Sequence, residues 1–132
     1  MVIRKSILNS LFDTISSTEI ESCGLLIGVF RDTYVEAIGY RNATNILRSI
    51  YEFEIDPKDL IKTYVEAKEK GLEIIGIYHT HINHPPIPSK KDIEGMELWP
   101  VPWLIISIPT REYTAWMLCR EKVIKMRIKL LD

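Results

Sequence analysis

The sequence lacks several features that would assign it to a specialised class of protein. It contains no glutamine and two cysteines, Cys23 and Cys119, whose separation fits neither a disulfide framework nor a zinc-knuckle spacing. We therefore expect both cysteines to be small buried residues. No apolar run is long enough to cross a bilayer, and no secretory cleavage site follows Met1. These absences predict a cytoplasmic protein without a membrane partner.

An excess of one charge sign is also lacking. Lysine and arginine number 17 against 18 aspartates and glutamates, so the net charge is −1 with neutral histidines. This balance argues against a nucleic-acid partner, which would require a strongly basic surface. Basic residues gather only at residues 120–129, where alternation with apolar residues predicts the solvent face of a strand. With 132 residues, 46% of them hydrophobic, the chain fits one domain spanning residues 1–132.

Three segments carry the sequence signals of helices. Apolar residues recur with a 3.6-residue period over Lys5–Ile15. A second helix should begin at Asp56-Pro57, an N-cap residue followed by proline, and end at Lys70 before Gly71. A third is expected over about 90–98. The apolar face expected for the second helix consists of Leu60, Ile61, Tyr64, Val65 and Ala67.

Short apolar or β-branched runs predict strands between and after these helices. The expected strands are Ser22–Phe30, Thr33–Tyr40, Tyr51–Ile55, Glu73–His81, Trp103–Ile108, Thr114–Arg120 and Val123–Leu130. Because helices interleave with strands that are mostly linked as hairpins, the fold class should be α+β, or mixed α/β.

All three histidines of the chain, His79, His81 and His84, fall within six residues. Strand side chains alternate, so His79 and His81 should project from the same face at the end of their strand. Two neutral imidazoles so placed suit a zinc ion. A surface strand that happens to carry two histidines remains an equal reading of this pair alone.

A downstream segment supplies a carboxylate that would complete such a site. Asp92 would be the third protein ligand and leave a fourth position open for water. Ser89 and Asp92 also have the spacing of a capping box at a helix start, and both interpretations can hold together. A base is still needed, and Glu19 and Glu21 are equal candidates. For Glu21, a solvated strand start or a capping box with Thr18 is the structural alternative.

Two blocks of the sequence resemble the JAMM/MPN+ metalloproteases. Residues 21–28 match Glu-x-Cys-Gly-Leu-Leu-x-Gly, and residues 79–81 followed by Ser89 and Asp92 match His-(Ser/Thr)-His-x7-Ser-x2-Asp without a gap. The resemblance extends over nearly the whole chain. It implies an MPN-type fold with a cytidine-deaminase-like β-sheet flanked by helices.

The resemblance also implies a role for each matched residue. One Zn²⁺ per chain would be bound by His79, His81 and Asp92, with water as the fourth ligand. Glu21, rather than Glu19, would act as general base and then as general acid. Ser89 would stabilise the oxyanion.

The implied reaction is hydrolysis after the C-terminal Gly-Gly of a ubiquitin-fold modifier, either to free it from conjugates or to release a precursor or sulfur carrier. The compact length is most similar to prokaryotic members of the family, such as the archaeal desampylases.

One departure from the family pattern lies directly after the second histidine. Many relatives have proline there, whereas residues 82–84 intervene here before Pro85. His84 is therefore a surface residue, a support for a ligand or a contact to substrate. Among the aromatic residues, Trp103 is expected in the core. Trp99 is a candidate to contact the modifier or a second copy in a homodimer.

Three other functions compete with this interpretation. A non-catalytic MPN scaffold would usually lack one or more of the ligands, and all are present here. A RadC-like protein associated with DNA repair shares the histidine block, but the charge balance does not favour DNA. A carboxypeptidase-like enzyme that trims sulfur carriers or peptides would differ in substrate alone.

Overall fold

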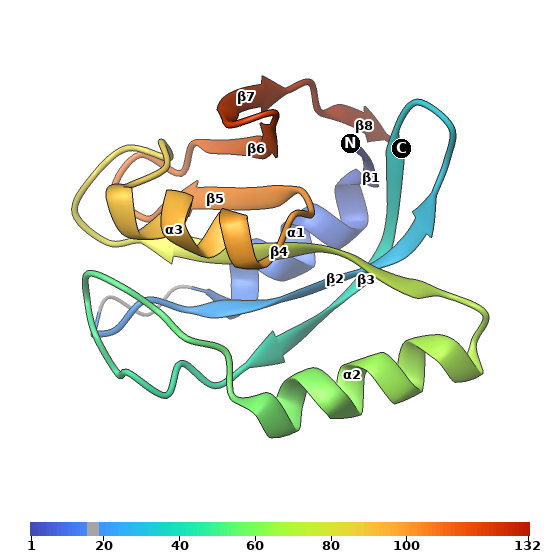
Figure 1. Cartoon of the computed structure of the whole chain (residues 1–132), viewed down its shortest axis with the longest axis horizontal. Coiled ribbons are helices and arrows are strands. Elements are labelled where there is room, and N and C mark those ends of the chain that lie inside the picture. The colour runs from blue at the N-terminus through green and yellow to red at the C-terminus, as the bar shows by residue number, and fades with distance from the viewer. Residues whose placement is uncertain (16–18) are drawn as a thin grey trace.

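The computed structural model describes residues 1–15 and 19–132, which form three helices and one eight-stranded sheet (Figure 1). In chain order the elements are β1 (Val2–Arg4), α1 (Lys5–Thr14), β2 (Cys23–Phe30), β3 (Val35–Ala43), α2 (Pro57–Glu69), β4 (Glu73–His81), α3 (Lys90–Leu98), β5 (Trp103–Ser107), β6 (Tyr113–Cys119), β7 (Lys122–Met126) and β8 (Lys129–Leu131). No helix in this part of the chain has the length and apolar character to cross a membrane.

The sheet is mixed, with strand order β7-β6-β5-β4-β2-β3-β1-β8. Strand β4 runs parallel to β5 and antiparallel to β2. Strands β7 and β8 stand at opposite ends of this order, although only residues 127–128 separate them. The sheet must therefore curl until its two edges approach each other (Figure 1). The expected mixed α/β fold is confirmed.

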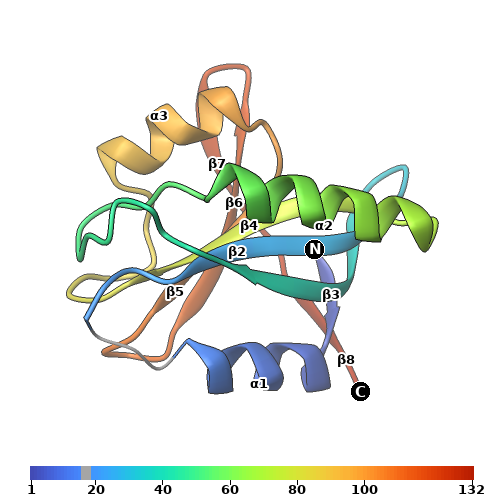
Figure 2. The same cartoon turned by 90° about the horizontal axis from the view of Figure 1, so that it is seen from below.

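Helices cover both faces of the sheet, with α1 on one side and α2 and α3 on the other (Figure 2). Successive residues of a strand therefore pack in two different hydrophobic cores, one on each face of the sheet. Leu26 and Tyr78 pack in the α1 core, whereas Leu25 and Ile77 pack in the core that includes Met96 of α3. Since the histidines of β4 continue the phase of Ile77, they point to the α2–α3 face.

Both ends of α2 follow the sequence prediction. The Asp56 carboxylate accepts a hydrogen bond of 2.9 Å from the Lys58 N–H, and Pro57 occupies the first helical position. At the other end Gly71 has φ +71°, and its N–H bonds the Lys68 carbonyl at 3.0 Å.

The predicted apolar face of α2 is correct only in part: Ala67 is buried and Leu60 packs against the core as expected, but the other members are exposed. Thr63 and Ala67 are the buried residues of the helix, while Ile61 and Tyr64 are 64% and 56% exposed. Small side chains on the inner face let the helix approach the sheet closely. The bulky apolar residues are consequently left on the outer surface.

The strand predictions also need corrections. Tyr51–Ile55 is not a strand, because its backbone pairing is limited to an isolated bridge from Ile55 to Asn45. The predicted strand Val123–Leu130 is two strands, β7 and β8, which pair with β6 and with β1. Strand β1, three residues long, was not predicted.

The cysteines and the core tryptophan were predicted with mixed success. Trp103 is buried at 3% exposure, as expected. Both cysteines are free thiols among the described residues, but only Cys23 is buried and Cys119 is exposed. The prediction for Cys119 was wrong because it lies where β6 turns into β7, at the edge of the sheet.

Candidate metal and catalytic site

The C-terminal end of β4 places its two histidines beside the start of β2. His79 pairs with Cys23 in the antiparallel register, so the preceding Glu21 lies opposite His81. The N–H of Thr80 also bonds the Ser22 carbonyl at 3.0 Å, which extends the pairing to residues before the start of β2. Opposed residues of an antiparallel pair project from the same face, so Glu21 shares the α2–α3 face with both histidines.

Helix α3 brings the third predicted ligand to the histidines. The capping box predicted at its start is present: the Asp92 N–H donates to Ser89 Oγ at 3.1 Å, and the Ser89 N–H donates to Asp92 Oδ2 at 3.0 Å. The same carboxylate lies 3.0 Å from His79 Nε2 through Oδ1 and 2.9 Å from His81 Nε2 through Oδ2. The helix cap thus fixes the carboxylate that faces both rings.

The orientation of each imidazole ring is set by its own neighbours. His81 Nδ1 lies 2.8 Å from the Pro85 carbonyl, to which it can only donate, so in the neutral ring Nε2 is the nitrogen with the lone pair. Its Nε2 is 3.3 Å from His79 Nε2. The His79 ring stacks on Phe53, with centroids 4.4 Å apart, and meets the edge of Trp103. Two ring nitrogens and two carboxylate oxygens therefore meet at one point.

Burial and charge set the protonation of these three groups. Burial lowers the pKa of His79, although Asp92 opposes this change. Burial also acts to lower the pKa of His81, but its bonds to Asp92 and the Pro85 carbonyl outweigh it and raise that pKa. For Asp92, the histidines and the Ser89 N–H outweigh burial and hold the pKa well below its usual range. In this cluster the buried, ionised carboxylate of Asp92 faces the imidazole nitrogens of the two histidines.

Glu21 differs from every other carboxylate of the site in having no partner. It is 1% exposed, and neither carboxylate oxygen has a hydrogen-bond partner among the described residues. Burial, together with the charges of Asp92 and Glu52, outweighs the effect of His81 and raises the pKa of Glu21 to about 8. Its rival Glu19 is exposed. The proposed capping partner Thr18 lies outside the described residues.

His84 lies beside the site rather than on the open surface. It is half-buried, and its ring centroid is 4.0 Å from that of His81. Its carbonyl accepts a bond of 3.0 Å from Ser107 Oγ on β5. A ligand atom of His84 lies within 4.8 Å of the Glu21 carboxylate and of His81.

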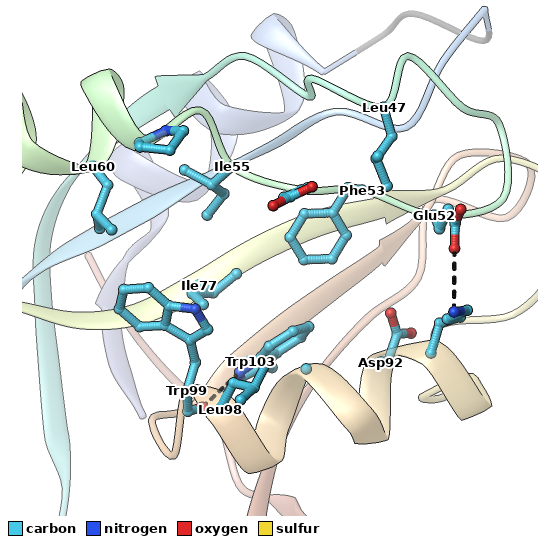
Figure 3. A pocket seen from close by; sticks show the side chains of 14 residues that line it. Leu47, Glu52, Phe53, Ile55, Leu60, Ile77, Asp92, Leu98, Trp99 and Trp103 are labelled. Atoms are coloured by element: carbon cyan, nitrogen blue, oxygen red, sulfur yellow. Dashed lines mark hydrogen bonds and ion pairs between the residues drawn. The ribbon is translucent and has the colours of Figure 1, made fainter.

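An apolar cavity of about 420 Å³ opens next to Asp92, between residues 44–56 and α3 (Figure 3). Phe53 and Trp103 both line it, and their rings pack against each other with centroids 5.5 Å apart (Figure 3). Trp99, 38% exposed, lines it too, while its carbonyl accepts a bond from Trp103 Nε1. The cavity therefore leads from the protein surface to the carboxylate of the site.

Two residues important to this arrangement, Asn45 and Phe53, were missed in the sequence analysis. Asn45 is buried, and its side-chain amide bonds the Glu21 and Glu52 carbonyls and the Leu47 and Glu54 N–H groups, each at 3.1 Å. Its bonds to residues 52–54 take the place of hydrogen bonds that a neighbouring strand would make. Asn45 belongs to no periodic pattern or motif block, and the run that contains Phe53 indicated a strand but gave no signal of a contact with a histidine.

The side chains of the cluster fit a zinc-like cation. Two imidazole nitrogens and one carboxylate form the usual protein ligand set of a zinc site with an open position. The pairing of His81 Nδ1 with a carbonyl is the support that ligating histidines commonly have. The unpartnered Glu21 carboxylate is adjacent, as a proton carrier would need to be.

Comparison with known proteins agrees with this fold and with a hydrolase whose side chains could hold a metal ion. The profile of Prok-JAB, prokaryotic homologues of the JAB domain, matches residues 14–119. The chain is 40% identical over 129 residues to a desampylase of Pyrococcus furiosus, covering 97% of this chain and 89% of that protein. The chain belongs to the prokaryotic JAB-domain family, and it is an enzyme of the hydrolase class.

More distant relatives share parts of the sequence or the fold alone. A probable TtuB-protein conjugate cleaving protease of Thermus thermophilus is 38% identical over 50 residues, which is 38% of this chain and 33% of that protein. A solution structure from Desulfitobacterium hafniense superposes with a TM-score of 0.89 at 21% identity, covering 99% of this chain and 92% of that chain. A solution structure from Salinibacter ruber has a TM-score of 0.75 at 25% identity, covering 100% of this chain and 92% of that chain.

Proposed function

We propose that this enzyme hydrolyses the bond that follows the C-terminal Gly-Gly of a ubiquitin-like modifier, and so frees the modifier from lysine conjugates or from a precursor. One observation carries the proposal: two imidazole nitrogens and a carboxylate converge beside a buried carboxylate that has no partner. The names of the desampylase and of the conjugate-cleaving protease supply the class of substrate.

One zinc ion per chain would be held by His79, His81 and Asp92. When bound, zinc would supply a Lewis acid that polarises the scissile carbonyl and makes water acidic enough to attack near neutral pH. The Asp92 carboxylate, held by the helix cap, and the Nε2 of His81, aligned by the Pro85 carbonyl, are preorganised to bind the ion.

Glu21 would transfer the proton. It takes a proton from the attacking water and passes it to the leaving amine, so its pKa should lie near the working pH. A pKa of about 8 meets that requirement, and burial is its main cause. The backbone of Glu21 is fixed on both sides, by the Ser49 carbonyl at 2.8 Å and by the Asn45 amide at 3.1 Å.

Ser89 would donate to the oxyanion that forms at the attacked carbonyl. Its Oγ already accepts the Asp92 N–H, which leaves the O–H free to serve as the donor. The same contact fixes the side chain at the first turn of α3, so the donor needs no reorganisation when charge develops.

The modifier tail would lie in the cavity beside Asp92. A Gly-Gly end has no side chains and fits a narrow apolar channel that Phe53 and Trp103 line. His84, which lies against His81, and the partly exposed Trp99, which lines the cavity, would contact the substrate. A globular modifier body would remain outside on the surface next to Trp99.

The test is cleavage of a ubiquitin-fold protein joined through its Gly-Gly end to a lysine, with matched linear and isopeptide substrates. The assay is run with added zinc, with a chelator and with Glu21→Gln, while metal content is measured by elemental analysis. We expect cleavage that needs zinc, and a loss of at least about 100-fold in Glu21→Gln without loss of zinc. Cleavage by zinc-free protein, or by Glu21→Gln at the wild-type rate, would contradict the mechanism.

A further inference from the structure

A second group of potential ligands lies next to the proposed zinc site. One ligand atom each from Glu21, His81 and His84 lie within 4.8 Å of one another. This group shares only His81 with the first cluster. It has one carboxylate and imidazole nitrogens, the same donor chemistry as the first.

His81 has no free nitrogen to offer to a second ion. Its Nε2 faces Asp92 at 2.9 Å and its Nδ1 donates to the Pro85 carbonyl at 2.8 Å. The ligands that remain for a second cation are the Glu21 carboxylate and the His84 ring. Two protein ligands make a weaker site than three.

The Glu21 carboxylate is buried at 1% exposure, and neither oxygen has a hydrogen-bond partner among the residues that the structure describes. A buried carboxylate in its charged form is costly without a countercharge or donors. A cation on the His84 side would supply that countercharge, and His84 is the neighbouring side chain with a lone pair to contribute.

The loop holds His84 in this place. The His84 carbonyl accepts from Ser107 Oγ at 3.0 Å, and the next carbonyl, that of Pro85, accepts from His81. The ring therefore lies against His81, with centroids 4.0 Å apart. Residues 82–84, which separate the second histidine from the proline, are what carry this imidazole to the site.

We propose that Glu21 and His84 form a second, weaker cation site for zinc, and that its occupation inhibits the enzyme. The proposal rests on the proposed function, because Glu21 must be free to carry a proton. A cation coordinated by the Glu21 carboxylate occupies the lone pairs that would accept that proton. Zinc would then activate at one ion per chain and inhibit beyond it.

The first measurement is zinc stoichiometry at rising free zinc, by equilibrium dialysis against metal buffers. The proteins are wild type, His84→Ala, Glu21→Gln and the control Asn83→Ala, an exposed position in the same loop. We expect wild type and Asn83→Ala to bind a tight zinc and then a second, weaker one. His84→Ala and Glu21→Gln should keep the tight zinc and lose the second.

The second measurement is the initial cleavage rate against free zinc, with each protein normalised to its own maximum. The wild-type rate should rise and then fall, and in His84→Ala the fall should move to free zinc about tenfold higher or more. A wild type that saturates at one zinc, or a second zinc retained by His84→Ala, would overturn the second site alone. Absence of the tight zinc would instead overturn the proposed function.

Discussion

Asn45 links the proposed base to the wall of the cavity through one side chain. Its amide donates to the carbonyls of Glu21 and Glu52 and accepts from the N–H groups of Leu47 and Glu54. Every hydrogen-bonding position of the amide is therefore used inside the protein. Because residues 52–54 carry the Phe53 ring that stacks on His79, the geometry around the ligands depends on this residue.

Asn45→Asp should damage both stability and catalysis. A carboxylate oxygen would replace the NH₂ group and face two carbonyl oxygens in a buried place, which should cost about 1–3 kcal/mol of the free energy of unfolding. We expect kcat to fall while zinc content stays the same. Denaturant unfolding, kcat and metal analysis check this, with the exposed Asn83→Asp as control. Equal kcat in both variants would rule out a role in positioning.

The two thiols should differ sharply in reactivity. Burial, with the nearby Glu21 and Asp59 charges, raises the pKa of Cys23 to about 12, so its thiol stays protonated at pH 8. Cys119 is exposed. A thiol reagent added to the native enzyme should therefore react with Cys119 alone, and with both cysteines after unfolding. Rapid native labelling of a Cys119→Ser variant would contradict the buried, protonated state of Cys23.

At this scale the sequence was most informative where residues are close together in the chain. The three proposed ligands were identified from strand alternation and from motif spacing, and the structure brings them together. For His84, the spacing left open whether it lies on the surface or at the site. Its contact with His81 depends on how residues 82–84 fold over the ring, which no periodic pattern describes.

Among the elements, α3 controls the site because it carries Asp92 and packs against β5. The contact is close at Gly95, where an added Cβ would lie 2.6 Å from Cη2 of Trp103. Trp103 is 3% exposed, and its ring also contacts Phe53 and His79, with centroids 5.5 and 5.6 Å away. The helix can therefore approach the sheet at this point only because residue 95 has no side chain.

Gly95→Ala should push α3 outward and move Asp92 away from the histidines. Alanine is favoured over glycine within a helix by about 1 kcal/mol, so stability should change little, while zinc affinity should fall about tenfold or more. Chelator competition and thermal unfolding measure the two effects, with Glu97→Ala on the exposed side of α3 as control. Unchanged zinc affinity would mean that the ring or the helix adjusts without moving Asp92.

The residues at which a helix begins and ends were easier to predict than the side of the helix that is buried. The start and end of α2 depend on local chemistry, the Asp56 cap and the positive φ of Gly71, and both were correct. Its buried face depends on which side chains fit against β2 and β4, and there Thr63 and Ala67 are preferred to bulkier neighbours. Tyr51–Ile55 resembled a strand, but the Asn45 amide takes the place of a second strand.

On the scale of the whole molecule, the apolar residues left outside α2 continue the surface beside the site. A second cavity of about 540 Å³ is bordered by Ile61, Tyr64 and Trp99, and it shares Leu60 and Trp99 with the cavity next to Asp92. A substrate tail in the first cavity would therefore bring the body of the modifier against this apolar face.

Tyr64→Ala should raise KM for a globular conjugate by about tenfold and leave kcat unchanged. A short peptide ending in Gly-Gly-lysine should be cleaved as by wild type, because it does not reach α2. The matched control is Tyr34→Ala, another exposed tyrosine, located directly before β3. A wild-type dimer in sedimentation that Tyr64→Ala dissociates would instead assign this face to self-association.

The meeting of the two sheet edges was the global feature least accessible from the sequence. It depends on β1 and β8, three residues each, which pair in parallel across almost the full length of the chain. Strands this short have no readable period. The longer central strands β2 and β4, which carry the site, were predicted with nearly correct bounds.

The ligands and the base are arranged differently along the chain, and this has an evolutionary consequence. All three proposed ligands lie within residues 79–92, whereas Glu21 lies just before β2 and is brought to them by the pairing of β2 with β4. Substitutions during evolution could therefore remove the transfer of the proton without affecting the binding of the ion. A relative in which Glu21 alone is substituted would keep the ion, the helix cap and the cavity. It would bind the same modifier without cleaving it, and would act as a binding protein in place of a protease.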